Sequence, residues 1–186
     1  MAVVINATVG SASANSYLTL AEATAIIDGF IESDAVTGWN AGQTDGKNRA
    51  LFTAAQRLDR ERFLGARVTD TQALQWPRTG VRKPDTYINT YAVGFPFRIT
   101  ADYFAENEIP TQIKYAQAYL AAYLHHDHNS LELSGLEDYK SVSIGSISVV
   151  TNTSGAVGAD KIPPMVERYL IGIRLGGPGN IAIRRS

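Results

Sequence analysis

Cysteine is absent from the 186 residues of this sequence. Its absence excludes a disulfide framework, a thiolate zinc site, an iron–sulfur cluster and a cysteine nucleophile. No apolar run approaches the roughly 20 residues that a membrane-spanning helix needs. The N-terminus also lacks the basic region that is typical of a secretory signal. We therefore expect no membrane partner and synthesis in the cytoplasm.

Positive charge is missing from one end of the chain. Residues 1–46 contain no lysine or arginine, but they carry the acidic side chains Glu22, Asp28, Glu32, Asp34 and Asp45. Residues 161–186 show the opposite bias, with Glu167 against Lys161, Arg168, Arg174, Arg184 and Arg185. The net charge of −1 hides this asymmetry. Complementary ends suit subunits packed side by side, and a chance distribution remains the open alternative.

Apolar residues recur at helical spacing in four stretches, which predicts helices over residues 20–32, 47–64 and 110–128 and from Pro163 to about residue 175. Thr19 and Glu22 form a capping-box pattern at the first of them. The glycine-containing stretch 33–46 predicts a loop anchored by Trp39. Residues 140–151 alternate in hydropathy on both sides of a Gly-Ser pair, which predicts a β-hairpin.

These elements predict a mainly α (α+β) fold: a small bundle of about four helices with a projecting hairpin and extended N- and C-terminal arms. Residues 1–175 form one domain, and residues 176–186 form an extended tail after a Gly-Gly-Pro-Gly stop. Residues 82–109 are irregular and rich in aromatic side chains, and we interpret them as a functional or interface-forming excursion.

Chemical motifs are scarce, so we expect no enzyme and no cofactor. His125 and His128 have the i,i+3 spacing of a chelating pair, but these and His126 are the only histidines, and a helix C-terminus favours such side chains by itself. Arg78, Arg82 and Lys83 lie among aromatic residues, a mixture that can contact phosphates and stack bases. The isoelectric point near 6.3 argues against a dense basic surface.

A set of motifs in fixed order carries a resemblance to a known family. Asn15-Ser16-Tyr17-Leu18 precedes an acidic helix, and Arg57-Leu58-Asp59 lies in the next long helix. The most specific motif is residues 72–81, with the signature residues Gln72, Leu74, Trp76, Pro77, Arg78 and Gly80. The chain resembles the tailed-bacteriophage head–tail connector, or adaptor, proteins, which are often labelled DnaT-like single-stranded-DNA-binding proteins.

The resemblance implies a structural protein of the virion, made in the bacterial host. It implies a ring of about twelve copies below the portal protein, with a tail or neck protein on the opposite face and double-stranded DNA passing through the lumen. From the residues we predict that the tail docks on the portal or on a neighbouring subunit through Arg174, Ile181, Ile183, Arg184 and Arg185. The alternative is a DnaT-like replication protein that binds single-stranded DNA.

Overall fold

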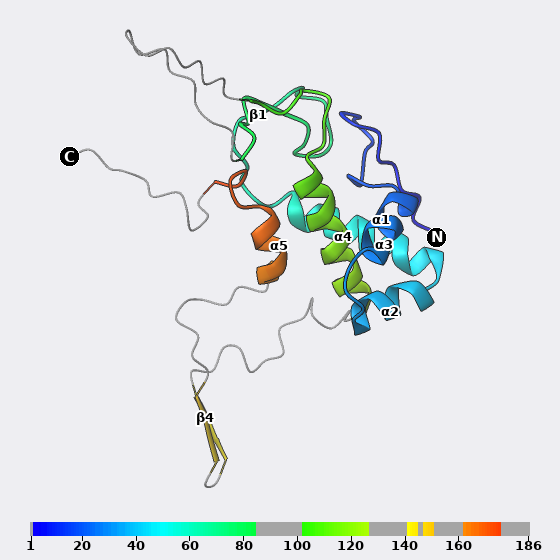
Figure 1. Ribbon diagram of the computed structural model, residues 1–186, viewed down its shortest axis with the longest axis vertical. Helices are drawn as coiled ribbons and strands as arrows, with labels where there is room; N and C mark the ends of the chain where they lie inside the picture. The colour runs from blue at the N-terminus through cyan, green and yellow to red at the C-terminus, as the bar shows by residue number, and fades with distance from the viewer. Residues whose placement is uncertain (1, 85–101, 127–140, 145–146, 151–161, 176–186) are drawn as a thin grey trace, which may run out of the picture.

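A computed structural model describes residues 2–84, 102–126, 141–144, 147–150 and 162–175 (Figure 1). Within these ranges the chain is mainly helical with two short antiparallel strand pairs, which confirms the predicted α+β class. The helices are α1 (Leu20–Asp28), α2 (Asp34–Ala41), α3 (Thr44–Leu58), α4 (Thr111–His126) and α5 (Pro164–Tyr169). The strands are β1 (Ala66–Arg67), β2 (Arg78–Thr79), β3 (Ser141–Ile144) and β4 (Ile147–Val150).

Helix α1 begins as its sequence predicts. The backbone N–H of Glu22 donates to the Thr19 hydroxyl at 3.2 Å, and the Thr19 N–H donates to the Glu22 carboxylate at 2.9 Å. These two bonds satisfy amides that the first turn would leave without partners. The helix ends at Asp28 and not at residue 32, and Ile31 beyond it is 93% exposed. The apolar residues after Asp28 therefore do not continue the buried stripe.

The prediction of a loop over residues 33–46 is wrong, because α2 lies inside it. Ser33 caps this helix by accepting a hydrogen bond from the Val36 N–H at 3.4 Å. Val36 and Trp39, three residues apart, are buried on one helical face. The helix was not predicted because it contains Gly38, and glycine is a poor helix former. Trp39 is nevertheless the anchor that the sequence indicates.

Helix α4 lies at the centre of the fold and contacts α1, α2, α3 and α5 (Figure 1). Of the predicted stripe, Ile113, Ala116, Leu120 and Leu124 are buried, whereas Tyr123 is only half-buried. The alanines at 118, 121 and 122 are buried as well, so small side chains face neighbours on several sides. Small residues let helix backbones approach closely, which explains how one helix can pack against four others.

Helix α3 stops at Leu58, earlier than the predicted end at Leu64. Residues 59–64 instead turn toward the end of the chain, where the Leu64 N–H donates to the Ile173 carbonyl at 2.9 Å and Phe63 pairs with Arg174. Gly65 therefore does not cap α3. It has a φ of 70°, and a side chain there would collide with the Thr79 carbonyl, because β1 and β2 are paired at that point.

The predicted hairpin is confirmed, since β3 pairs with β4 in antiparallel register from Ser141 opposite Val150 to Ile144 opposite Ile147. Helix α5 begins at Pro164, one residue after the predicted start at Pro163, which caps it, and it ends at Tyr169, before a turn with Gly172 at a φ of 85°. Much of the aromatic excursion (85–101), the loop 152–160 and the tail 176–186 lie outside the described residues, and with them Ile181, Ile183, Arg184 and Arg185.

Candidate nucleic-acid interface

The signature segment, residues 72–81, forms a loop that is fixed from the inside by Trp76. The Trp76 side chain is 1% exposed, and its ring meets those of Phe63 and Phe104 edge-on at centroid distances of 5.8 and 6.0 Å. Such edge-to-face pairs fix the orientation of a ring as well as its depth. The loop is therefore part of the core and provides a firm base for the residues around it.

Gln72 closes the same loop with its side-chain amide. Its Nε2 donates to the carbonyl oxygens of Leu74 at 2.8 Å and Pro77 at 3.0 Å, and its Oε1 accepts from the Thr69 N–H at 3.1 Å. Gln72 is buried, so these bonds replace the water that its amide would otherwise need. The signature glutamine is thus explained by loop closure.

Arg78 supports the segment from the opposite side and is only 7% exposed. Its guanidinium donates to the carbonyls of Leu64 and Gly65, each at 2.7 Å, and to the side-chain oxygen of Gln75 at 2.9 Å. Burial lowers the pKa of Arg78 below its usual range. The structure therefore corrects the view of Arg78 as a phosphate contact, because its donors are directed at backbone carbonyls inside the protein.

The second motif of the resemblance, residues 15–18, is held by a buried polar network. The Tyr17 hydroxyl donates to the Asp59 carboxylate, which also accepts the Gln75 N–H at 3.3 Å. Burial raises the pKa of both Tyr17 and Asp59. From α4, Gln117 accepts the Tyr17 N–H at 2.9 Å. This network joins the N-terminal segment, α3 and the signature segment into one frame.

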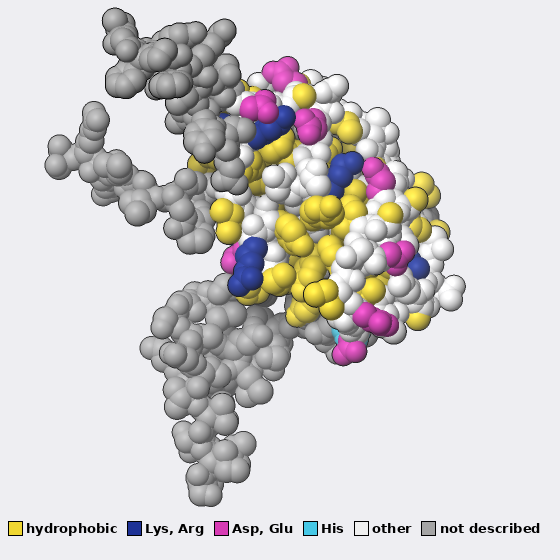
Figure 2. All heavy atoms as spheres, in the orientation of Figure 1, with side chains coloured by type: hydrophobic (Ala, Val, Ile, Leu, Met, Phe, Trp, Pro, Cys, Tyr) yellow, Lys and Arg dark blue, Asp and Glu magenta, His cyan; other side chains and the backbone are white. Residues whose placement is uncertain are grey.

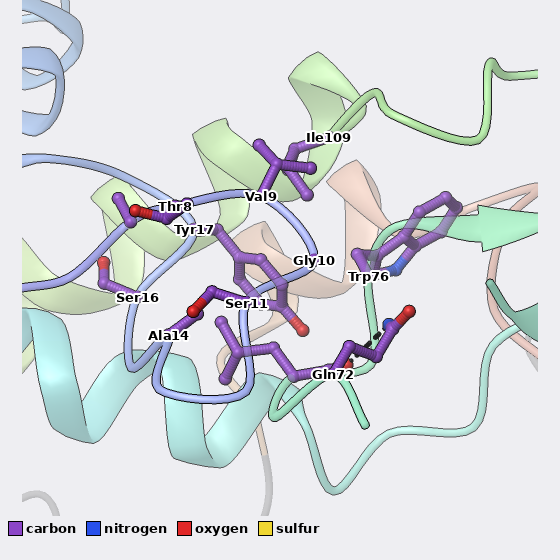
Figure 3. Close-up of a pocket in the computed structure, with 12 residues that line it drawn as sticks. Thr8, Val9, Gly10, Ser11, Ala14, Ser16, Tyr17, Gln72, Trp76 and Ile109 are labelled. Atoms are coloured by element: carbon purple, nitrogen blue, oxygen red, sulfur yellow. Dashed lines mark hydrogen bonds between the residues drawn. The ribbon is translucent and has the colours of Figure 1, made fainter. Parts of the chain in front are cut away.

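Figure 3 shows how closely these parts fit. Tyr17, Gln72 and Trp76 line a small hollow together with Val9 and Gly10 of the N-terminal segment. Its volume, near 10 Å³, leaves room for about one water molecule. The hollow is too small for a nucleobase, so a nucleic acid would have to bind outside this frame.

Basic residues are frequent in the stretch of chain that leaves α3 and passes through β1 and β2, and Figure 1 shows the path of this stretch. Residues 57–83 contain seven basic and three acidic residues, a surplus of four positive charges in a chain whose net charge is −1. We call this region the cationic end and define it by the six basic residues other than buried Arg78: Arg57, Arg60, Arg62, Arg67, Arg82 and Lys83.

Internal contacts engage two of the three acids in this region. Asp59 is turned inward to Tyr17, and Glu61 lies 2.5 Å from the Nε of Arg174. Arg174, predicted to meet an acidic partner surface, thus forms ion pairs with Glu61 and, at 3.4 Å, with Glu167. Lys83 forms an ion pair with Asp102 at 3.1 Å. Arg60, Arg62 and Arg67 are exposed on this surface, and the Arg67 guanidinium also donates to the Gln72 carbonyl at 3.3 Å.

The histidine cluster does not form a metal site within the described residues. The His125 ring packs edge-on against Trp39 at 5.6 Å, and a side chain added at Gly42 would collide with it. Burial lowers the pKa of His125, and nearby Lys47 lowers it further. His125 is therefore a half-buried side chain that packs against the core residue Trp39. His128 lies outside the described residues.

A second surface feature is apolar and lies elsewhere. Hydrophobic side chains gather over α4 in Figure 2, and a groove there is lined by Phe30, Tyr119, Tyr123, Met165 and Tyr169 together with residues of the α1–α2 connection. That connection carries Glu32, so the groove adjoins the acidic part of the chain. In the part of the chain that the structure describes, no helix combines the length and hydropathy that a bilayer crossing requires.

Sequence reasoning identified Arg82 and Lys83 but did not single out Arg62 and Arg67 as interface residues. The signal that reveals them is the local surplus of basic residues over 57–83, which the net charge of the whole chain does not show. Tyr103 was likewise grouped with the other aromatic residues of the excursion. The structure separates Tyr103, which is 53% exposed, from its buried neighbour Phe104.

Comparison with known proteins gives one family. The family model described as "Putative DnaT-like ssDNA binding protein" matches residues 1–186. Neither a curated protein nor a solved structure matches the chain.

This finding overturns the predicted connector function. The matching family is described by single-stranded DNA binding, and nothing in the comparison points to a head–tail connector in a virion. Nor does it support a portal partner, a tail partner or a ring of subunits. The motifs that carried the resemblance belong to the structural frame, so they identify the family without indicating a portal or a tail. The alternative agrees with the family description.

Proposed function

We propose, since the chain belongs to the family of DnaT-like single-stranded-DNA-binding proteins, that it binds single-stranded DNA through its cationic end. The family match over the whole chain supports single-stranded DNA as the ligand. The charge surplus of residues 57–83 supports the cationic end as the binding surface. The proposed location depends on this charge surplus, together with the exposure of Arg60, Arg62 and Arg67 in the structure.

Electrostatics favours this surface over the rest of the molecule. Nucleic-acid affinity depends largely on neutralising phosphates with Lys and Arg, which releases counterions. Residues 1–46 have no positive charge, so the N-terminal segment, α1 and α2 would repel a phosphate backbone. A net charge near zero is compatible with binding because the basic residues are concentrated in one stretch of the chain, residues 57–83.

The frame gives the cationic end a fixed shape. Arg67 lies on β1 opposite Arg78 on β2, and the guanidinium of Arg78 ties this strand pair to the turn at Leu64 and Gly65. Cations held on a fixed surface lose less conformational freedom when they bind than cations on a mobile chain. The buried network thus serves binding indirectly, by positioning the exposed arginines.

The test is the salt dependence of binding to a fluorescent oligo-dT, followed by anisotropy. We expect the double variant Arg62→Ala with Arg67→Ala to lower the slope of log K against log salt by about 1.4, because each lost phosphate contact on a single strand accounts for about 0.7. Extrapolated from 1 M salt, the same difference makes binding about 25-fold weaker at 0.1 M.

Arg49→Ala is the matched control, since Arg49 is an exposed arginine on α3 that forms an ion pair with Asp45 at 2.8 Å. It removes one positive charge from outside the cationic end, and we expect its salt slope to match that of the wild type. A wild-type protein that binds oligo-dT no better in 50 mM salt than in 1 M salt would contradict the proposal. So would equal losses in the Arg49 variant and in either single variant, Arg62→Ala or Arg67→Ala.

A further inference from the structure

Tyr103 lies beside the cationic end, in the C-terminal part of the excursion (residues 82–109). The Lys83 N–H donates to the Asp102 carbonyl at 2.8 Å, and the Phe104 N–H donates to the Val81 carbonyl at 3.0 Å. These bonds flank an antiparallel bridge in which Arg82 lies opposite Tyr103. Tyr103 is therefore fixed next to residues 81–83 although it is twenty residues away in sequence.

Side-chain alternation divides this bridge into an inner and an outer face. Val81 and Phe104 are buried, and the Phe104 ring meets that of Trp76. Lys83 and Asp102 share that face, which explains their ion pair and the position of the Lys83 ammonium 5.9 Å from the centre of the Phe104 ring. Arg82 and Tyr103 belong to the opposite face, because successive side chains in an extended strand point in opposite directions.

The outer face therefore pairs an exposed aromatic ring with a cation. Directly opposite residues in an antiparallel pair have Cβ atoms about 5 Å apart, so the Tyr103 ring and the Arg82 side chain start from neighbouring positions. A single strand of DNA needs this combination: a π-face for a base and a positive charge for the adjacent phosphate. The carboxylate of Asp102 is turned to the other face and does not oppose the phosphate.

We infer that Tyr103 is a base-stacking residue, which holds an unpaired nucleobase on its ring while the cationic end binds the adjoining phosphates. This inference rests on the proposed function and adds to it a contact with the base itself. The contact requires an unstacked base, so it distinguishes single-stranded DNA from a duplex of the same charge. Stacking of this kind tolerates any base, because every base has a π-face.

The experiment compares oligo-dT with an abasic oligomer of equal length, which keeps the phosphates and lacks the bases. We expect Tyr103→Leu to weaken binding to oligo-dT by about 5- to 100-fold and to leave binding to the abasic oligomer unchanged. Tyr103→Phe keeps the ring and should bind oligo-dT within about twofold of the wild type. Tyr115→Leu is the matched control, since Tyr115 is also exposed but packs its ring 5.8 Å from that of Tyr169.

A second readout uses Tyr103→Trp. The native tryptophans Trp39 and Trp76 are 0% and 1% exposed, so DNA cannot stack on their rings. A tryptophan introduced at position 103 would be exposed to solvent, and a change in its fluorescence would report stacking at that position. We expect oligo-dT to quench its fluorescence and the abasic oligomer not to quench it.

The outcomes separate the inference from the proposed function. If the wild type fails to bind oligo-dT, the proposed function fails. If the wild type binds but Tyr103→Leu binds equally well, the stacking inference is overturned while DNA binding stands. Equal losses for Tyr103→Leu on both oligomers would also overturn it, as would a loss in Tyr103→Phe equal to that in Tyr103→Leu, because that result would assign the contact to the hydroxyl.

Discussion

Replacing Arg78 with methionine tests whether this residue supports the structure or binds the ligand. Methionine keeps an apolar stem of similar length and removes the guanidinium. The two shortest bonds, 2.7 Å each, then disappear, and the carbonyls of Leu64 and Gly65 lose these donors. A hydrogen bond to a charged group contributes about 1.5–3 kcal/mol, so the loss of two such bonds in Arg78→Met should lower the free energy of unfolding by about 3–6 kcal/mol. That is a large part of the stability of an ordinary domain.

Urea denaturation followed by circular dichroism measures the effect. With an m-value of about 2 kcal/mol/M, a loss of 4 kcal/mol moves the midpoint down by about 2 M. Arg78→Lys should recover only part of this loss, because an ammonium group cannot reproduce the planar fork that reaches both carbonyls and Gln75. Arg49→Met, on the exposed face of α3, should change stability by less than about 0.5 kcal/mol.

The reasoning would be refuted if Arg78→Met unfolded at the same urea concentration as the wild type. It would also be refuted if Arg78→Lys were fully as stable as the wild type, since a point charge would then suffice.

Two further predictions concern the stability of the fold and its dependence on pH. Leu120→Ala on α4 should lower the free energy of unfolding by about 2–5 kcal/mol, because Leu120 is fully buried. The control Ile31→Ala, at a position 93% exposed, should leave that free energy nearly unchanged. The midpoints of urea denaturation of the two variants test both expectations. The lowered pKa of His125 predicts that the folded protein becomes less stable in acid. Below about pH 6.5 the unfolded chain binds a proton at His125 more readily than the folded chain does. The neutral His125 therefore contributes to stability above that pH, and its contribution is lost as the pH falls. His125→Phe keeps an aromatic ring against Trp39, and in this variant the melting temperature should change less between pH 7.5 and pH 5 than in the wild type. An unchanged pH dependence of the melting temperature would exclude His125 as its source.

Local sequence signals predicted much of the fold, and particular residues show why. Thr19 and Glu22 fixed the start of α1, and the proline before Thr111 marked the start of α4. The ends of helices were harder to predict. Helix α3 stops at Leu58 because residues 63–64 pair with the far C-terminal turn, and no pattern within the helix announces a contact across that separation in sequence.

The candidate site illustrates the same limit. The basic residues of 57–83 are visible in the sequence, but burial decides their roles: Arg78 faces carbonyls, while Arg62 and Arg67 are exposed. Tyr103 could not be assigned from its own neighbourhood, because its partner Arg82 lies about twenty residues earlier in the sequence. The connector function was wrong for a related reason. The motifs that carried it are structural, so they could not tell which ligand the surface binds.

Photo-crosslinking to single-stranded DNA tests the central claim most directly. An oligonucleotide that carries 5-iododeoxyuridine is bound to the full chain at low salt, irradiated and digested, and the crosslinked peptides are identified by mass spectrometry. The account predicts crosslinks at Tyr103 and in peptides from residues 57–83, with competition by unlabelled oligo-dT. Crosslinks confined to the acidic region of residues 1–46, or none above the level of a protein that does not bind DNA, would contradict it.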